Sequence, residues 1–531
     1  MAPRMENDKI GKQAGVLSFF AALVFLVHPI QTQGVTYVYQ RTASLATFFY
    51  LATLVLYAQS WISRRKIYYI MSLVTLALAM FTKEIAFTLP LAVVLYEIIF
   101  LKQQGRFPWQ RVLPFIIALA IIPLIVFIEA KAPPAETLKS LEEAALLDWR
   151  EYLFTEFRVM VTYIRLLLLP IRQNLDYDYP IYASLLRLPV LASILFLASL
   201  FLAAIRLSAK YRLVSFGIFW FFLALLVESS VVPITDVIFE HRLYLPMIGF
   251  SLFLSTGLYY LIGNKNLKLM AVVMILIIIS YSALAYTRNS VWKDDFVLWD
   301  DVVHKSPRKA RGYHNRGMAI QASKEGNLLD AIADFNKAIE LKADYASAYS
   351  NQGRIYQATG DIQKALSYFN KAIQINPKSA NYYYNRGVIY QYTKDLTQAL
   401  ADYNKALEFN PQLFAAYNNR GNIYNDRSEF DLAIADYSKA IELDKTHPLI
   451  YFNRGNVYYT KKDFIKAIAD YSKAIEINFA FAPAYNARAM AYFFIKEYYK
   501  SWEDVRKAQG LGFRVSPGFL VDLEKELEKE E

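Results

Sequence analysis

Long apolar runs in the first half of the chain constrain its fold more than any other feature of the sequence. A helix that crosses a membrane needs roughly 17–25 largely apolar residues, because its backbone hydrogen bonds must all be made within the segment. Nine runs approach this length: 14–30, 42–61, 66–82, 85–101, 111–129, 188–205, 211–228, 246–263 and 268–285. We therefore predict an all-α, multi-pass transmembrane domain of about nine spans at residues 1–287.

The loops between these runs predict the orientation of the domain. Lys and Arg collect in alternate loops, as in Arg64, Arg65 and Lys66, and such loops stay on the cytoplasmic side. The N-terminus is then cytoplasmic, and everything after residue 286 lies outside, with membrane lipids as the surroundings of the spans. The absence of Cys and the regular repeats described below favour a bacterial inner membrane, with a periplasmic second domain. Much of the net charge of +11 lies in these loops, so it does not indicate a nucleic-acid partner.

One further segment, 152–171, would break the count of nine if it crossed the membrane. Its polar residues recur at steps of four and three, which places them in one stripe on a helix. They are Glu151, Thr155, Arg158, Thr162 and Arg165. An otherwise apolar helix with such a stripe is typical of the membrane interface. The alternative is a tenth span that packs its stripe inside the bundle.

Polar side chains gather at the ends of the apolar runs on the predicted outer face. They are His28, Arg41, Lys83, Glu84, Asp236, Glu240, His241, Arg242 and Tyr244. Ionisable residues at such depths are costly and usually serve a site or an anchor at the interface. Snorkelling or helix capping is the alternative for any single residue. Because the inner loops show only plain basic residues, we interpret the outer set as candidates for a functional site.

From residue 310 the chain repeats itself. Six units begin with sequences such as "YYNRGVIY", and their small residues follow one another at intervals of 36 and then 34 residues: Gly317, Gly353, Gly387, Gly421, Gly455 and Ala489. A period of 34 is that of tetratricopeptide (TPR) repeats, which are helix–turn–helix units stacked into an α-solenoid. We predict six TPR repeats at 310–515 and a capping helix at 516–531. The linker at 288–309 resembles the second helix of a unit.

An asparagine stands two residues before the glycine in five of the units. This Asn ladder consists of Asn315, Asn351, Asn385, Asn419 and Asn453. In peptide-binding TPR proteins, an Asn at this place faces the concave groove and holds the backbone of the peptide, which its carboxamide can both donate to and accept from. The ladder therefore predicts an extended peptide or protein segment as partner. The alternative is that each Asn satisfies groups within its own repeat.

The membrane half resembles the transmembrane-and-TPR family of protein O-mannosyltransferase-like proteins, which have the GT-C glycosyltransferase fold. The likeness lies in "HPIQTQGVTYVYQRTASLATFFYLATLVLY", "FTKEIAFTLPLAVVLYE", "YIRLLLLPIRQNLDYDYP" and "FEHRLYLPMIGFSL", followed by "RNSVWKDDFVLWDDVVHKSP" before the repeats. The resemblance implies transfer of a sugar from a polyprenyl-phosphate carrier to a Ser or Thr hydroxyl on the outer side. It also implies that the nine outer-face residues line the transfer cavity, where Arg41, Lys83 or Arg242 suits the carrier phosphate.

The family pattern also includes an acidic residue in the loop after its first span, which is proposed to act as general base. The first apolar run here matches a later family span, so we expect either a fragment from a misplaced start or a derivative that lacks the base. Asp236 and Glu240 match a different stretch and are not assigned that role. The alternative function is therefore a non-catalytic, membrane-anchored TPR scaffold, and the catalytic residues stay unassigned.

Other chemistry has no support in the sequence. The five His residues lack the spacing of a zinc site, and no Walker loop, GxSxG elbow or HExxH motif occurs. We therefore predict no metal site and no tightly bound cofactor, with the polyprenyl-phosphate sugar acting as donor.

Overall fold

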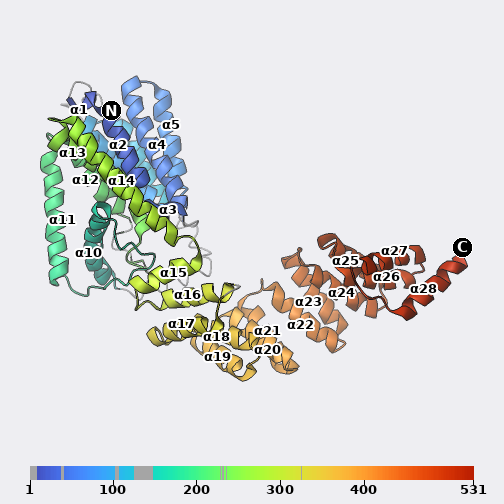
Figure 1. Ribbon diagram of the computed structural model, residues 1–531. Coiled ribbons are helices and arrows are strands. Elements are labelled where there is room, and N and C mark those ends of the chain that lie inside the picture. The colour runs from blue at the N-terminus through green and yellow to red at the C-terminus, as the bar shows by residue number, and fades with distance from the viewer. Residues whose placement is uncertain are drawn as a thin grey trace. The chain divides into compact units, whose positions relative to one another are not determined.

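The computed structural model describes residues 9–36, 41–101, 107–124, 148–227, 229, 233–234, 236–323 and 326–530. The chain divides into two compact units, Met1–Ala319 and Ile320–Glu531. Every regular element in the described residues is a helix, which agrees with the predicted all-α class (Figure 1). The division falls inside α16 (Ala310–Ala322), so most of the first predicted repeat helix belongs to the first unit.

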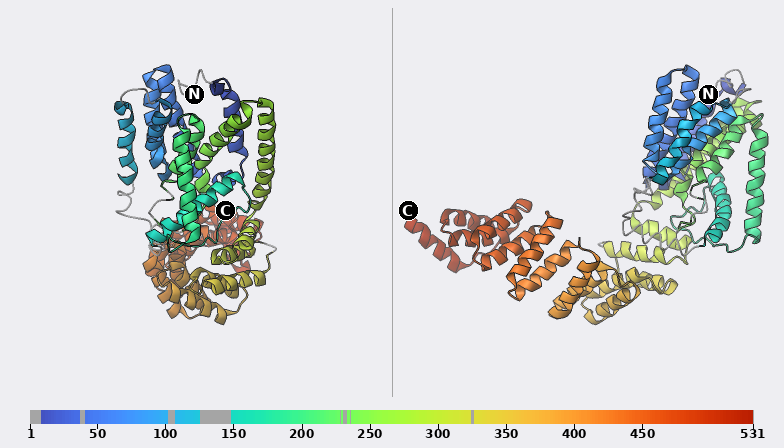
Figure 2. Two further views of the ribbon diagram at one scale, coloured as in Figure 1. Left: turned by 90° about the vertical axis from the view of Figure 1, so that its left-hand side faces the viewer. Right: turned by 180° about the vertical axis from the view of Figure 1, so that it is seen from behind.

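The first unit is a bundle of apolar helices followed by two more polar ones. In chain order the elements are α1 (Lys9–Lys12), α2 (Ala14–Val27), α3 (Gln31–Thr36), α4 (Arg41–Ser63), α5 (Lys66–Met80), η2 (Glu84–Thr88), α6 (Leu89–Tyr96), η3 (Glu97–Leu101), α7 (Trp109–Ile117), η4 (Ala118–Ala120), α10 (Trp149–Leu168), α11 (Leu188–Leu207), α12 (Arg212–Leu225), η5 (Glu240–Leu243), α13 (Pro246–Leu258), η6 (Tyr259–Gly263), α14 (Leu267–Val291), α15 (Asp295–Lys305) and α16. The helices α11 and α14 lie on the outside of the bundle (Figures 1 and 2).

The nine predicted runs all form apolar helices, but they differ in length. In the described part of the chain, five helical stretches are long and apolar enough to cross a membrane: Thr42–Ser63, Glu84–Leu101, Leu188–Leu207, Pro246–Gly263 and Leu267–Val291. The other four, Ala14–Val27, Lys66–Met80, Trp109–Leu124 and Arg212–Leu225, are shorter. The count of nine spans is therefore not confirmed by helix length. One cause is local: Pro29 disfavours helical backbone at His28, which is extended with φ −69° and ψ 128°.

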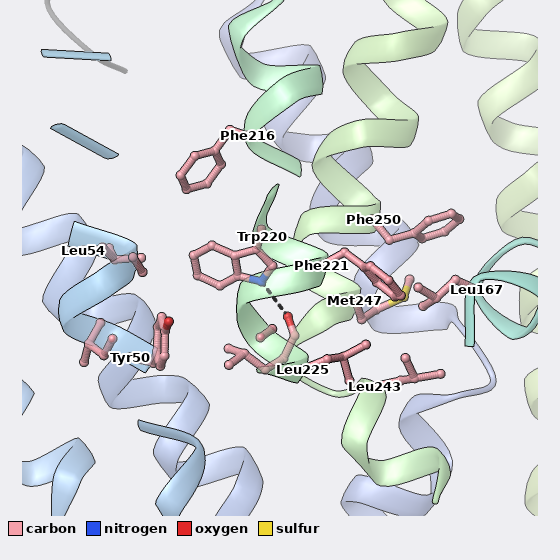
Figure 3. Packing of buried hydrophobic residues seen from close by; sticks show 14 of the residues in the cluster. Tyr50, Leu54, Leu167, Phe216, Trp220, Phe221, Leu225, Leu243, Met247 and Phe250 are labelled. Carbon is pink, nitrogen blue, oxygen red and sulfur yellow. Dashed lines mark hydrogen bonds between the residues drawn. The ribbon is translucent and has the colours of Figure 1, made fainter. Parts of the chain in front are cut away.

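The core of the bundle is aromatic. Trp220 of α12 is 1% exposed, and its indole N–H donates to the backbone oxygen of Leu245 over 2.8 Å (Figure 3). The ring of Tyr50 packs edge-on against it, with centroids 5.3 Å apart. Beside it, α12 and α13 cross closely at two glycines. The approach leaves no room for a side chain, since a Cβ on Gly249 would lie 2.6 Å from the backbone oxygen of Gly217. Small residues at such crossings let helices approach each other within a membrane.

The helix predicted at 152–171 is α10, and it is not among the stretches suited to cross a membrane. Part of its polar stripe is covered by the chain that follows it. The Thr155 hydroxyl accepts from the backbone N–H of Tyr182 over 2.9 Å, and the Thr162 and Tyr179 hydroxyls lie 2.8 Å apart. The stripe thus packs partly on protein, and the placement of α10 at the membrane interface stays a prediction.

The second unit is a row of antiparallel helix pairs, which agrees with the predicted α-solenoid (Figure 2). Its helices are α17 (Leu328–Leu341), α18 (Ala346–Ala358), α19 (Ile362–Ile375), α20 (Ala380–Tyr392), α21 (Leu396–Phe409), α22 (Phe414–Asp426), α23 (Phe430–Leu443), α24 (Pro448–Thr460), α25 (Phe464–Ile477), α26 (Ala482–Phe494), α27 (Tyr498–Gly510) and α28 (Pro517–Glu530). In the last of these, Leu523 is fully buried against the end of the row.

Three helix pairs, α20–α21, α22–α23 and α24–α25, are held by the same two contacts. The glycine of the first helix lies on an aromatic ring of the second, so that a Cβ on Gly387 would stand 2.9 Å from the ring of Tyr403. The arginine before that glycine binds an aspartate 16 residues later, as Arg386 binds Asp402 through two contacts of 2.8 and 2.7 Å. The pair recurs as Arg420–Asp436, Arg454–Asp470 and Arg488–Asp504.

The turn inside each pair contains a residue with left-handed backbone. In one unit this residue is Gly360, with φ 84°, but in the next four it carries a side chain. These four are Lys394, Ser428, Lys462 and Lys496, with φ between 61° and 65°. Their backbone conformation is uncommon for residues other than glycine.

Candidate functional site

A polar cavity of about 660 Å³ lies in the first unit. Its lining comes from segments far apart in the sequence: Gln33 in α3, Lys83 and Glu84 at the start of η2, His241 and Arg242 in η5, and Asn315 in α16. Four of the nine predicted site residues therefore meet at one place. A second cavity, of about 440 Å³ between α2, α4, α12 and α13, has no charged residue in its described lining and offers no comparable chemistry.

Lys83 and Glu84 reach the cavity because α5 ends at Met80 and the chain turns before η2 begins. The backbone of Lys83 is extended, and η2 begins at the next residue, Glu84. Glu84 is exposed, and among the described residues its carboxylate has no hydrogen bond or ion pair. A carboxylate and an amine thus stand side by side in the cavity wall.

His241 lies behind this pair. Its backbone N–H donates to the Gln33 side-chain oxygen over 2.9 Å, and its ring packs on Phe239 with centroids 5.0 Å apart. The Nδ1 atom is buried, and it has no hydrogen-bond partner within the described ranges. Burial, and to a smaller extent the charges of Lys83 and Arg242, lower the pKa of His241 to about 3. The imidazole is therefore neutral at physiological pH.

The Arg242 guanidinium is a buried part of the wall. It donates to the backbone oxygens of Val237 and Asp236, each over 3.0 Å. The carboxylate of Glu156, which is fully buried in α10, lies 3.6 Å away. Arg242 therefore supplies positive charge to the cavity from a fixed position, and Glu156 is a buried partner that no sequence pattern marked.

Glu240 points away from the cavity into a separate network. Its carboxylate accepts from the Asn174 backbone N–H and the Tyr177 hydroxyl, both over 2.6 Å, and Arg288 lies 3.8 Å away. Burial raises the pKa of Glu240, and the charge of Arg288 opposes that rise. This predicted site residue joins the 173–178 segment to α14 and does not line the cavity.

Three other predicted residues also lie off the lining. His28 is buried, with Nε2 2.9 Å from the Leu167 oxygen and Nδ1 accepting from the Ile30 N–H over 3.2 Å, so both ring nitrogens bind backbone. Tyr244 packs edge-on against Phe25, with ring centroids 5.6 Å apart. The Asp236 carboxylate binds Arg311 next to the cavity. The side chain of Arg41 lies outside the described residues.

The cavity also contains residues that the sequence did not single out. Arg311, in the first turn of α16, donates twice to Asp176, over 2.7 Å each, and once to Asp236 over 2.9 Å. These three residues form the Arg311 clamp. Both Arg311 and Asp176 line the cavity. The one available signal was the basic cluster at 308–311, at the start of the repeat region.

A buried carboxylate elsewhere in the bundle has a structural environment. Glu97 accepts from the Tyr57 hydroxyl over 2.5 Å and from the Trp61 indole N–H over 2.9 Å. The Arg111 guanidinium lies 4.2 Å from the centroid of Trp61. Because Glu97 lines neither of the two cavities described above, we regard this cluster as part of the packing of α4 on η3.

The Asn ladder does not have one environment. Asn419 donates to the Tyr384 and Tyr403 hydroxyls over 3.4 and 3.5 Å, and Asn453 donates to Asn418 and Asn422. All four contacts go to the preceding repeat, so they differ from the alternative interpretation, in which each Asn satisfies groups within its own repeat. The other members are half-buried, and Asn315 lines the cavity of the first unit.

Comparisons with known proteins agree with the repeats. Family models described as "Tetratricopeptide repeat" match residues 308–378, 344–412 and 448–479, and one described as "TPR repeat" matches 421–462. The presence of TPR repeats is thus confirmed. Among solved structures, YrrB, titled as a TPR protein with an unusual peptide-binding site, covers 36% of this chain and 97% of its own at 24% identity, with a TM-score of 0.31. PilF of Pseudomonas aeruginosa covers 35% and 85% at 22% identity, with a TM-score of 0.32.

The relatives found among curated proteins share one name. Protein O-mannosyl-transferase TMTC3 of Homo sapiens is 25% identical over 377 residues, which cover 64% of this chain and 41% of that protein. Protein O-mannosyl-transferase F38B6.6 of Caenorhabditis elegans is 24% identical, over 64% and 48%. The chain thus spans less than half the length of these relatives. With the repeats, these matches confirm the predicted resemblance of the chain to the transmembrane-and-TPR family of protein O-mannosyltransferase-like proteins.

Proposed function

We propose that the protein is a membrane glycosyltransferase that moves a sugar from a polyprenyl-phosphate carrier to a Ser or Thr hydroxyl of a protein. The observation that carries this proposal is the cavity that unites Lys83, Glu84, His241 and Arg242. These residues come from two of the stretches that resemble the family, which lie more than a hundred residues apart in the sequence. The names of the relatives favour mannose as the sugar.

The basic residues of the cavity suit the carrier phosphate. Lys83 is a flexible, strongly hydrated point charge, which can approach a phosphate from several directions. The Arg242 guanidinium is already bonded to two backbone oxygens, so it contributes charge from behind Lys83. Because His241 is neutral, it adds no positive charge that would hold the phosphate product too tightly. Lys83 is therefore the proposed phosphate ligand.

Glu84 suits the acceptor hydroxyl. A general base must be within hydrogen-bond reach of the proton that it removes, and it needs an oxygen available for that bond. The carboxylates of Asp176 and Asp236 are bound by Arg311, and that of Glu240 is buried with Arg288. Glu84 and Asp295 line the cavity and have no such partner in the described part of the chain, and Glu84 is the one that adjoins Lys83. We assign it the role of general base.

The solenoid would hold the acceptor protein outside the membrane, on the predicted periplasmic side. The Asn ladder and the TPR repeats support a protein or peptide partner, with backbone recognition and therefore low sequence specificity. A second candidate function is a non-catalytic scaffold anchored in the membrane. It is favoured by the Arg311 clamp and by the Glu240 network, which together occupy three of the outer-face carboxylates.

Transfer from polyprenyl-phosphate mannose to a Ser- and Thr-containing peptide, by the full chain in lipid nanodiscs, tests the two functions. We expect Glu84→Gln to lower kcat by roughly 10²–10⁴-fold, the usual contribution of a general base. Lys83→Gln should raise the KM for the donor by roughly tenfold or more, the loss of a hydrogen bond to a charged group. The exposed Lys265, which does not line the cavity, serves as the control for loss of charge, as Lys265→Gln.

The outcome separates the candidates. Wild-type protein that binds the peptide, but neither transfers mannose nor releases it to water, would support the scaffold. Full activity of Glu84→Gln together with Lys83→Gln would show that the transfer site lies elsewhere.

A further inference from the structure

The first helix of the repeat region forms part of the cavity wall. Arg311 and Asn315 stand four residues apart in α16, so they share one face of that helix, and both line the cavity. The Asn315 side-chain oxygen lies 3.0 Å from Nδ1 of His314. For its amide nitrogen, no partner occurs among the residues that the structure describes. Asn315 therefore presents hydrogen-bonding capacity toward the cavity.

The position of α16 is held by several contacts to the 173–178 segment. The Arg311 clamp binds Asp176 and Asp236. Just before α16, the Ser306 hydroxyl accepts from the Asn174 side chain over 2.8 Å and from the Asp178 backbone N–H over 2.9 Å. The Lys305 amine donates to the Gln173 backbone oxygen over 2.8 Å. The face that carries Asn315 is thus fixed against the membrane half of the same unit.

The environment of Asn315 differs from that of later members of the Asn ladder. Asn419 and Asn453 donate to side chains of the solenoid itself. Asn315 instead borders an open volume of about 660 Å³. The same residue type in the same repeat position therefore has different surroundings in the first unit.

The charges around the cavity indicate which ligand Asn315 would bind. Among the described lining residues, Lys83, Arg242 and Arg311 are basic, and Glu84, Asp176 and Asp295 are acidic. The two sets balance, so the wall as a whole selects neither an acidic nor a basic side chain. A carboxamide donates and accepts at once, which matches the N–H and C=O of a peptide group. This combination fits the backbone of an extended, neutral polypeptide segment.

We propose that Asn315 is a positioning residue that binds the backbone of the acceptor polypeptide inside the cavity, and that the Arg311 clamp holds it there. This proposal rests on the proposed function and identifies the acceptor contact of that same site. It assigns the first repeat helix to the transfer site and sets Asn315 apart from the rest of the ladder. Side-chain specificity at this contact is low, because the bond is made to the backbone.

A single reporter cysteine tests the proposal without relying on activity. The chain has no Cys, so Thr42→Cys introduces a unique thiol at an exposed residue of the cavity lining and leaves Asn315 intact. In nanodiscs, a neutral peptide rich in Ser and Thr should slow labelling of this reporter thiol by a maleimide. Asn315→Ala should raise the peptide concentration needed for half-maximal protection of the thiol by roughly three- to tenfold. This factor corresponds to the loss of one or two hydrogen bonds. Asn315→Gln should restore part of the protection, and a scrambled peptide should protect equally.

Asn289→Ala is the matched control and should leave protection unchanged, since it removes an exposed carboxamide of the same unit that does not line the cavity. Equal protection of the reporter thiol with and without the Asn315→Ala change, or no protection at all, would overturn the proposal. The kinetic counterpart is a rise of the peptide KM in Asn315→Ala that is larger than any change in kcat. If protection depends on Asn315 but the protein transfers no sugar, the proposed function is wrong and the peptide contact at Asn315 stands. If the protein transfers sugar but the peptide does not protect the reporter thiol, the peptide contact is wrong and the proposed function stands.

Discussion

The two units of the molecule use arginine in different ways. In the solenoid, Arg386, Arg420 and Arg454 each bind an aspartate 16 residues later, with the same geometry every time. In the first unit, Arg311 binds Asp176 across 135 residues, and no second pair among the described residues repeats that arrangement. The solenoid is thus stabilised by local contacts that recur, whereas the first unit is stabilised by single contacts between distant segments.

This difference predicts how each unit responds to damage. In a solenoid each repeat contacts only its neighbours, so its stability is roughly a sum of repeat and interface contributions. In the first unit, the 173–178 segment, η5, α14 and α15 share one network through Glu240, Arg288 and Asp301. Loss of one member should therefore be felt by all of these elements.

The largest effect is expected from Glu240→Ala. This change leaves the Tyr177 hydroxyl and the Asn174 N–H without their buried acceptor, at a cost of about 1–3 kcal/mol for each group, whereas Arg288 keeps Asp301 at 3.0 Å. Hydrogen exchange measured by mass spectrometry should increase together in 173–178, η5, α14 and α15. The matched change in the solenoid is Asp402→Ala, which should increase exchange mainly in α20, α21 and their neighbours. If Asp402→Ala instead increased hydrogen exchange throughout the solenoid, the proposed difference between local and shared stabilisation would be wrong.

A smaller effect concerns pH and belongs to the first unit. The pKa of His241 is about 3 in the folded protein, below the value of about 6.5 for an unperturbed histidine, because burial and the charges of Lys83 and Arg242 oppose protonation. Unfolding therefore takes up a proton at acidic pH. The contribution of His241 to stability is complete above pH ~6.5 and decreases as the pH falls from there toward 3, by about 2 kcal/mol at pH 5.

His241→Gln isolates this contribution. Thermal unfolding followed by tryptophan fluorescence near neutral pH and near pH 5 should show a smaller acid-induced loss of stability for the variant than for wild type. Parallel losses in both proteins would show that His241 is protonated without cost in the folded state, and that its ring is more hydrated than the geometry indicates.

The smallest effect distinguishes two members of the Asn ladder. Asn419→Ala removes hydrogen bonds to Tyr384 and Tyr403 and should destabilise the solenoid by about 0.5–1.5 kcal/mol. Asn385→Ala should cost less, since the Asn385 side chain makes no hydrogen bond within the described residues. Urea unfolding of both variants measures the difference. If both Asn residues instead hold a peptide, both changes should weaken peptide binding alike, and peptide titration of the same two variants decides between these roles.

The contrast between the units also explains what the sequence revealed. The helix pairs were predictable because a glycine and an aromatic residue 16 positions later, as in Gly387 and Tyr403, recur in four consecutive units, and local contacts leave a period in the sequence. The apolar runs were equally visible, but their helical lengths depend on local breaks such as Pro29. The number of spans therefore could not be read from composition.

The site was only partly predictable for a related reason. The predicted outer-face clustering included Lys83, Glu84, His241 and Arg242, because the alternation of basic loops predicts which segments share one side of a membrane. It could not show that neighbouring side chains point in different directions, so Glu240 was grouped with His241 although it enters another network. The Arg311–Asp176 pair joins two segments that no period or motif connects.

The left-handed turn residues of the solenoid have a consequence for engineering. Lys394, Ser428, Lys462 and Lys496 hold a backbone conformation that glycine adopts readily, as Gly360 does at the equivalent turn. Each of these residues lies in the turn of a different repeat. Glycine introduced at one, two, three or all four positions would relieve strain in independent increments. A series of such variants would therefore unfold at stepwise higher temperatures. None of these substitutions changes a residue of the interhelical contacts or of the Asn ladder.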